Sequence, residues 1–357
     1  MNRLLQIREL GQQIWLDNLS RTLIRDGHLN RLIADGVSGI TTNPAIFQKA
    51  IASGRYYQED LAALKNQPLG AEARYEALVI PDVQAACELL RPVWEASGGT
   101  MGYVSLEVSP ALAHDREGTL QAGLRLHQAV RRDNLLIKVP ATPAGLGAIE
   151  DLIAAGVSVN VTLMFSLAHV DAVAAAYLRG LNRLQASGGD LSRVMSVASL
   201  FLSRVDTLVD RRLDTLGGKA RNWLGRSAVS MAKLAYTRYR ACFHGADFAR
   251  LRAAGARPQY LLWASTGTKN PEYSDLLYVE PLIGAETINT LPDATLAALL
   301  DHGKVANTLD QDLNQAAECF QALQELGIDM QAIGETLQNE GLRQFEEAFA
   351  SLLALTR

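Results

Sequence analysis

Short apolar segments alternate with longer stretches of helical pattern eight times along this chain of 357 residues. The apolar segments lie near residues 13, 38, 101, 135, 158, 193, 259 and 277, and a helical stretch follows each of them. This alternation predicts a parallel sheet covered by helices, either closed as a (β/α)₈ barrel or open as a doubly wound sheet. The eighth strand is expected at Leu276–Ile283.

The chain contains more helical pattern than eight such units require. Helices are expected before the first strand, between residues 53 and 98, and from residue 294 onward. The middle stretch predicts helices at 71–78 and 80–95, and Pro92 is expected to kink or split the second of these. In the last stretch an apolar stripe is expected to pack as core, formed by Leu342, Phe345, Phe349, Leu352 and Leu353. We therefore predict one domain over residues 1–357, a TIM-type barrel with extra N-terminal, inserted and C-terminal helices.

A lysine interrupts one of the expected strands. Lys138 lies within the apolar run Leu135–Val139, which has the length and composition of a buried parallel strand. Burial disfavours the charged form of a lysine, and a neutral lysine is a nucleophile that forms Schiff bases with carbonyl substrates. The alternatives are that this lysine extends along apolar surface to solvent, or that it pairs with a carboxylate.

Polar residues also stand at or near the C-terminal ends of other expected strands: Asp17, Asn43, Glu107, Asn160 and Ser199. In a barrel of this kind the active-site groups come from these strand ends, so the set predicts a site at one mouth. Two of these residues could have a structural role in place of a role in the site. Asp17 could cap the helix expected over residues 21–35, and Asn43 could close a turn before the next helix.

Two stretches have the composition of an anion site. Arg204 lies in the first turn of a helix expected over residues 203–216, and a helix N-terminus attracts anions. The alternative is that Arg204 pairs with Asp206 or Asp210 at the surface. The loop Gly267–Pro271 combines glycine, hydroxyl and lysine groups, which suits a phosphate.

Charge and cysteine content narrow the class of protein. A net charge of −4 provides no general attraction to nucleic acid or to anionic membranes. The three cysteines have no metal-type spacing, and their odd number argues against a disulfide framework, so we expect a cytoplasmic protein. Charged residues interrupt the first ten positions and no apolar stretch has the length of a membrane helix, so neither a signal peptide nor a membrane span is expected.

Six stretches together resemble the transaldolase family, in order and over nearly the whole chain: WLDNLSR, GITTNPAIF, SLEVSP, LLIKVPAT, NVTLMFS and ASLFLSR. The stretch TGTKNPEYSD and the C-terminal helices look like the longer transaldolase subgroup, which is also found fused to glucose-6-phosphate isomerase. The sequence stops at Arg357 without an isomerase half. The resemblance implies a transferase of the pentose phosphate pathway that moves a dihydroxyacetone unit from a ketose phosphate to an aldose phosphate.

The resemblance also implies a role for each matching residue. Lys138 matches the Schiff-base lysine, and Asp17 matches the residue that takes the C4 hydroxyl proton when the carbon–carbon bond breaks. Glu107 matches an acid and base that acts through a water, with Thr162 helping to hold that water. Asn43 and Asn160 match the amides that hold the three-carbon unit.

The remaining matches concern substrate binding. Thr41 shares a strand face with Asn43, and Ser199 and Arg204 match part of the phosphate site. Shorter family members have an arginine in an A-S-F-R run after the seventh strand, where this chain has Ala264 to Lys269. We therefore expect Ser265 in the site and Lys269 as the substitute phosphate ligand, a point charge in place of a bidentate fork.

The implied chemistry needs no metal or other cofactor, because the protonated imine nitrogen accepts the electrons. The six histidines show no HxH or HExxH spacing. The expected partners are sugar phosphates, with no nucleic acid and no membrane, and the oligomeric state stays open between monomer and homodimer. Two other functions are compatible with this fold: a related aldolase that releases free dihydroxyacetone, and a barrel that binds sugar phosphates without turnover.

Overall fold

A closed barrel of eight parallel strands forms the centre of the computed structural model, which describes residues 2–357. The strands are hydrogen-bonded in chain order and β8 closes onto β1, which confirms the predicted barrel and excludes the open sheet. The strands are β1 (Gln12–Leu16), β2 (Gly39–Ile40), β3 (Tyr103–Glu107), β4 (Leu135–Pro140), β5 (Val159–Met164), β6 (Ser196–Phe201), β7 (Tyr260–Ala264) and β8 (Thr287–Leu291).

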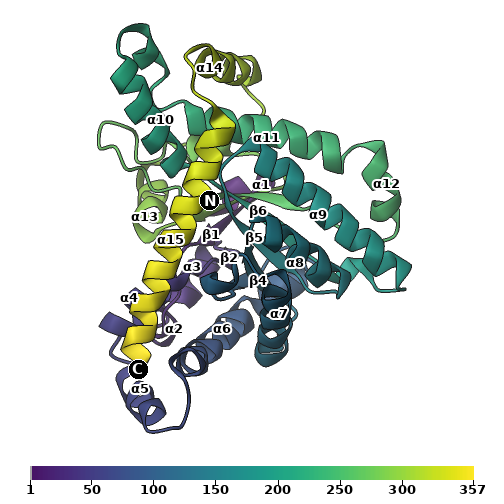
Figure 1. Cartoon of the computed structure of the whole chain (residues 1–357), viewed down its shortest axis with the longest axis vertical. Coiled ribbons are helices and arrows are strands. Elements are labelled where there is room, and N and C mark those ends of the chain that lie inside the picture. The colour runs from purple at the N-terminus through teal and green to yellow at the C-terminus, as the bar shows by residue number, and fades with distance from the viewer. Residues whose placement is uncertain (1) are drawn as a thin grey trace.

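Helices surround this barrel (Figure 1). The α-helices are α1 (Arg3–Glu9), α2 (Arg21–Arg25), α3 (His28–Asp35), α4 (Pro44–Ser53), α5 (Gln58–Lys65), α6 (Ala71–Ala96), α7 (Arg116–Val130), α8 (Pro143–Ala154), α9 (Leu167–Ala186), α10 (Ser203–Leu216), α11 (Ser227–Phe243), α12 (Ala246–Ala253), α13 (Asp293–His302), α14 (Leu313–Glu325) and α15 (Met330–Thr356). Short 3₁₀ helices are η1 (Pro110–Leu112), η2 (Leu191–Arg193), η3 (Gly218–Trp223) and η4 (Glu280–Leu282).

The eighth strand was wrongly predicted at Leu276–Ile283. That stretch forms turns and the 3₁₀ helix η4, and β8 lies at Thr287–Leu291. Pro281 within η4 has no N–H to donate to a sheet ladder, which explains why the apolar stretch does not form a strand. Its apolar side chains pack outside the barrel, where Leu276 joins a second cluster with residues of α1 and α13.

Two helix predictions also need correction. The predicted helices 71–78 and 80–95 form one continuous helix, α6, which contains both Pro81 and Pro92. A proline removes one helical hydrogen bond, but α6 buries a long apolar face against the barrel, so tertiary packing keeps the helix continuous. The helix expected over residues 21–35 is instead split into α2 and α3 at Gly27, whose φ of 72° lies in the left-handed region.

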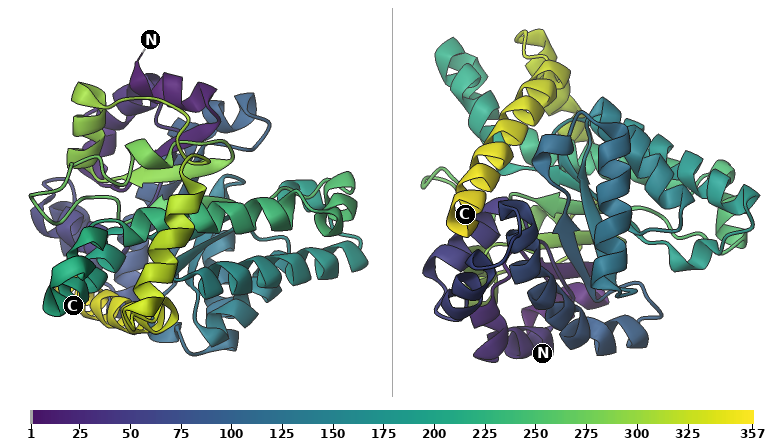
Figure 2. Two further views of the ribbon diagram at one scale, coloured as in Figure 1. Left: turned by 90° about the horizontal axis from the view of Figure 1, so that it is seen from above. Right: turned by 60° about the horizontal axis from the view of Figure 1, so that its bottom comes forward.

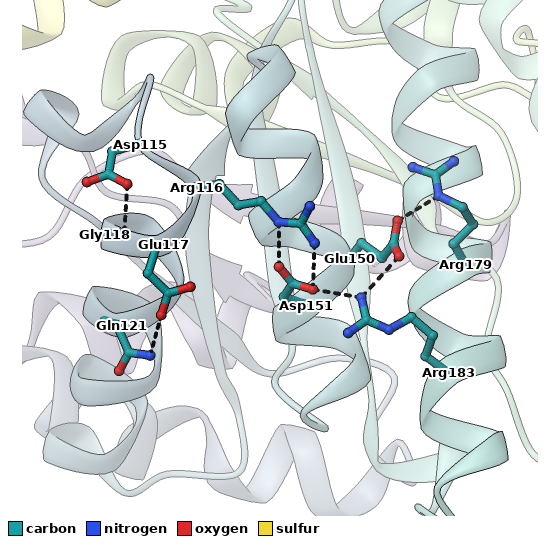
Figure 3. A network of polar contacts seen from close by, with 9 residues as sticks. All are labelled: Asp115, Arg116, Glu117, Gly118, Gln121, Glu150, Asp151, Arg179 and Arg183. Carbon is teal, nitrogen blue, oxygen red and sulfur yellow. Dashed lines mark hydrogen bonds and ion pairs between the residues drawn. The ribbon is translucent and has the colours of Figure 1, made fainter.

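The helices α7, α8 and α9 pack side by side and share a network of surface ion pairs (Figure 3). Asp151 on α8 accepts hydrogen bonds from Arg116 of α7 at 2.7 Å and from Arg183 of α9 at 2.6 Å. Glu150 accepts from Arg179 of α9 at 2.6 Å. Exposed pairs of this kind each contribute at most about 1 kcal/mol, so the network orients three helices and contributes little to the free energy of unfolding.

The final helix, α15, lies across the C-terminal ends of the strands and reaches from α14 to α4 (Figure 1). Gln338 on α15 donates hydrogen bonds of 3.0 Å to the carbonyls of Ala141 and Leu163, at the ends of β4 and β5. Gly341 allows close approach, because a Cβ there would lie 3.0 Å from the Leu163 side chain. The C-terminal helix therefore covers part of the barrel mouth.

On the side of the barrel away from α15, the helices α9, α11 and α12 project beyond the strands (Figure 2).

Within residues 2–357, no helix combines the length and the apolar character that crossing a bilayer requires.

Candidate active site

A pocket of about 140 Å³ opens at the C-terminal ends of the strands. Nine of the eleven side chains predicted for the site line this pocket: Asp17, Thr41, Asn43, Lys138, Thr162, Ser199, Arg204, Ser265 and Lys269. The other two, Glu107 and Asn160, lie in register beside Lys138 on β3 and β5. The fold therefore brings the predicted set together at one mouth.

Lys138 is buried, with 4% of its surface exposed. Its Nζ donates a hydrogen bond of 2.8 Å to the Thr42 carbonyl and lies 3.4 Å from Glu107 Oε2. The alternative in which this lysine reaches solvent is therefore wrong, whereas the alternative of a carboxylate partner describes its geometry. The Phe345 ring of α15 covers the amine, with 5.7 Å from Nζ to the ring centroid.

Glu107 ends β3 and its carboxylate is buried beside the lysine. Burial raises the pKa of Glu107 to about 7, although the charge of Lys138 opposes the shift. Apart from the contact with Nζ, its Oε2 has no hydrogen-bond partner among protein atoms, and the same holds for the buried Thr162 Oγ1. Buried polar oxygens normally find a partner, so these two atoms are available to a water or a substrate hydroxyl.

Asp17 follows β1 directly and faces the pocket. Its Oδ1 accepts a hydrogen bond of 2.7 Å from Thr41 Oγ1, which lies 2.6 Å from Thr290 Oγ1. Burial raises the pKa of Asp17, against the effects of the Thr41 hydrogen bond and the Lys138 charge. The alternative role as a helix cap is wrong, because Ser20 caps α2 through its side chain.

The two asparagines differ in how their amides are used. Asn43 does cap the next helix, since its Oδ1 accepts from the Ile46 amide at 3.0 Å, which leaves the Nδ2 group as its donor for a ligand. Asn160 is fully buried, with Oδ1 accepting from Ser199 Oγ at 2.7 Å and Nδ2 donating to Ser105 Oγ at 2.9 Å. These bonds fix the orientation of the Asn160 amide beside Lys138.

A cationic end of the pocket lies at the start of α10. Arg204 is half-buried, and its Nη1 atom has no hydrogen-bond partner. The alternative pairing of Arg204 is wrong, because Asp206 and Asp210 are bonded elsewhere. Burial lowers the pKa of Arg204, and the charge of Glu340 opposes that effect.

A second cation joins this end of the pocket. Lys269 is exposed and lines the pocket together with Ser265, whose Oγ lies 2.8 Å from Ser203 Oγ. A buried guanidinium nitrogen without a partner, a helix N-terminus and a nearby lysine are together suited to a phosphate group.

Sequence reasoning did not find all of the pocket. Phe201, Thr290 and Phe345 also line it. Phe345 was predicted as core, and it is buried as expected, but its ring forms one wall of the pocket. A helical stripe shows that a residue is buried and gives no sign of which group it covers. Within the described chain, no group of three or more His, Cys, Asp or Glu side chains is placed to hold a metal ion.

Comparison with known proteins identifies the family. A family model described as Transaldolase/Fructose-6-phosphate aldolase matches residues 14–356. The chain is 55% identical over 356 residues to a Transaldolase of Thiobacillus denitrificans, and 48% identical over 355 residues to one of Neisseria gonorrhoeae, with 99% of each chain covered in both cases. It is 43% identical over 366 residues to Transaldolase 2 of a Nostoc species, covering 99% of this chain and 96% of the relative.

The chain belongs to the transaldolase/fructose-6-phosphate aldolase family. The resemblance inferred from the six motifs is thereby confirmed over nearly the full length.

Proposed function

We propose that this protein is a transaldolase that transfers a dihydroxyacetone unit between sugar phosphates through a Schiff base on Lys138. The observation that carries the proposal is the buried Nζ of Lys138, 3.4 Å from a carboxylate oxygen of Glu107 in the pocket at the barrel mouth. Family membership supports the reaction type, and the geometry supports the residues.

The first step joins the ketose phosphate to the lysine. The amine of Lys138 attacks the C2 carbonyl to form a carbinolamine, and the protonated Glu107 carboxyl gives a proton to the departing hydroxyl, so that water leaves and a protonated imine forms. A water held between Glu107 Oε2 and Thr162 Oγ1 would carry this proton, since both oxygens are buried and lack a hydrogen-bond partner.

The second step breaks the C3–C4 bond. The Asp17 carboxylate takes the proton of the C4 hydroxyl, the bond electrons pass to the imine nitrogen, and an aldose phosphate leaves. The enamine of the three-carbon unit then remains on Lys138, and its hydroxyls would accept from the Nδ2 group of Asn43 and from the second Nδ2 hydrogen of Asn160. Attack of this enamine on a second aldose phosphate and hydrolysis of the imine complete the transfer.

Trapping with borohydride and fructose 6-phosphate, followed by peptide mass mapping, tests this proposal. A three-carbon adduct on Lys138 is expected. The absence of any adduct, in folded protein that binds the sugar phosphate, would favour the barrel that binds without turnover. A steady-state assay with and without an aldehyde acceptor separates the two enzyme functions. A transferase requires the acceptor for turnover, whereas an aldolase that releases dihydroxyacetone does not.

Glu107→Gln is expected to slow imine formation about 10²- to 10⁴-fold, the usual contribution of general acid–base catalysis. Because the pKa of Glu107 is raised to about 7, its carboxyl is protonated below that pH and donates the proton that dehydration needs. The single-turnover rate of imine formation should therefore show an inflection near pH 7 that the variant loses. An unchanged rate and pH profile in Glu107→Gln would remove Glu107 from this step.

Lys269→Ala is expected to raise the KM for the sugar phosphate about tenfold while changing kcat little, because a phosphate contact is made equally in the ground and transition states. The exposed Lys49→Ala on α4 is a suitable control for loss of one surface positive charge. A KM equal to that of the control would exclude Lys269 from the phosphate site.

We further propose a cytoplasmic location and one folded domain over the whole chain. All three cysteines are free thiols, which a reducing compartment preserves. One large core cluster joins residues of the barrel, the inserted helix α6 and the C-terminal helix α15, as a single domain requires.

A further inference from the structure

We propose that Tyr273 is a positioning residue that holds Lys269 at the phosphate end of the pocket through its hydrogen bond to Asp210. This inference deepens the proposed function and rests on it, since it takes Lys269 as a ligand of the substrate phosphate. The starting observation is that Lys269 is exposed and lies in the long connection between β7 and β8. A lysine on a flexible stem and a loop would be a poorly placed phosphate ligand without further support.

The connection is attached to one face of α10. Residues 203, 206 and 210 follow each other at helical spacings of three and four, so they share a face of that helix. Ser203 meets Ser265 through their hydroxyls at 2.8 Å, and the Ser203 amide donates to the Ser265 carbonyl at 3.1 Å. Asp206 accepts from Tyr278 at 2.9 Å, and Asp210 accepts from Tyr273 at 2.8 Å.

Two of these contacts lie on either side of Lys269 in the sequence. Ser265 lies four residues before it and Tyr273 four residues after it, so the segment that carries the lysine is anchored to α10 at both ends. A hydrogen bond of 2.8 Å from Thr268 Oγ1 to the Ser274 carbonyl closes the segment internally. Loss of the Tyr273 hydroxyl would remove the hydrogen bond to α10 that lies nearest to Lys269 on its C-terminal side.

Asp210 is itself held in place, which makes it a rigid acceptor. Its Oδ1 accepts from the Gly225 amide at 3.0 Å while Oδ2 accepts from Tyr273. The Tyr273 ring packs directly on Gly225, where an added Cβ would lie 2.9 Å from the ring. Removal of the tyrosine hydroxyl would therefore delete the hydrogen bond and leave the ring packing in place.

The contact of Asp206 with Tyr278 is less suited to this role. Both side chains are buried, and Asp206 also accepts from the Ala228 amide at the start of α11, so that contact is part of the structural core. Tyr273 is only partly buried and lies closer in sequence to Lys269. Arg204 extends from the same helix α10, which means that one helix places both cations, the first directly and the second through Tyr273.

The test is a double-mutant cycle between Tyr273→Phe and Lys269→Ala, read out as KM and kcat with fructose 6-phosphate and as inhibition by inorganic phosphate. Tyr273→Phe is expected to raise KM and the inhibition constant for phosphate by about threefold to tenfold with kcat nearly unchanged, the scale of one lost hydrogen bond. In the Lys269→Ala background the same substitution should have no further effect. A role limited to fold stability would leave both constants of the folded protein unchanged, and an effect independent of Lys269 would be additive.

A matched control is available at Tyr56, whose hydroxyl donates to Asp26 at 2.8 Å on the exposed surface near α2 and α5. Tyr56→Phe loses the same kind of bond and should leave all three constants unchanged. Equal KM values in Tyr273→Phe and the control, or additive effects in the cycle, would overturn the inference. Borohydride trapping on Lys138 in each variant separates this result from failure of the proposed function, which would remove the adduct from every protein including the wild type.

Discussion

Replacing Lys138 with alanine is expected to reduce turnover by about 10⁴-fold or more, the scale on which loss of a covalent nucleophile lowers kcat. Without the amine no imine forms, so the electron sink for carbon–carbon cleavage is lost along with the covalent link. Borohydride trapping should yield no adduct, while the circular dichroism spectrum should remain that of the folded barrel. Full activity in Lys138→Ala would exclude Schiff-base chemistry at this residue.

A second buried lysine provides the matched control. Lys233 on α11 is 5% exposed, and its Nζ donates to the carbonyls of Thr308 and Gln311 at 2.6 and 2.7 Å. Burial lowers the pKa of Lys233, but this lysine lies outside the pocket and beside carbonyls. Lys233→Ala should therefore keep the adduct on Lys138, which would show that position beside Glu107 matters and that burial alone does not create the nucleophile.

The barrel could be predicted because its signal is local and repeated. Most strands are short apolar runs, and most positions of β4 and β5 are apolar, so the pattern identifies them. The eighth strand was missed because β8 carries the polar residues Thr287 and Asn289 on its buried outer face and Thr290 on its inner face, which weakens its apolar character. The nearby stretch at 276–283 is more apolar, and Pro281 was the signal that it is not a strand.

The site was predictable where the residue type itself carries the chemistry. A lysine or carboxylate within an apolar strand is unusual, so Lys138 and Glu107 were visible from the sequence. The roles of Phe345 and Tyr273 could not be predicted from the sequence, because they depend on contacts between distant parts of the chain. The hydrogen bond between Tyr273 and Asp210 joins residues 63 positions apart, and no pattern within either segment reports it.

Asp17→Asn is expected to change which intermediate accumulates. The amide cannot take the C4 hydroxyl proton, so carbon–carbon cleavage should slow about 10²- to 10⁴-fold while imine formation on Lys138 continues. Borohydride trapping with fructose 6-phosphate should then yield a six-carbon phosphorylated adduct in place of the three-carbon adduct. An asparagine Oδ1 still accepts the Thr41 hydrogen bond that Asp17 accepts at 2.7 Å, so the local structure should be retained.

Asp293→Asn is the control for loss of a negative charge at the same mouth, since its exposed carboxylate accepts from Asn18 at 2.8 Å and does not line the pocket. This control should give the three-carbon adduct at the wild-type rate. The same three-carbon result in Asp17→Asn would mean that another group removes the C4 proton. A six-carbon adduct in Asp17→Asn alone would divide the chemistry between two residues: Lys138 would form the covalent link, and Asp17 would start the cleavage that makes the reaction a transfer.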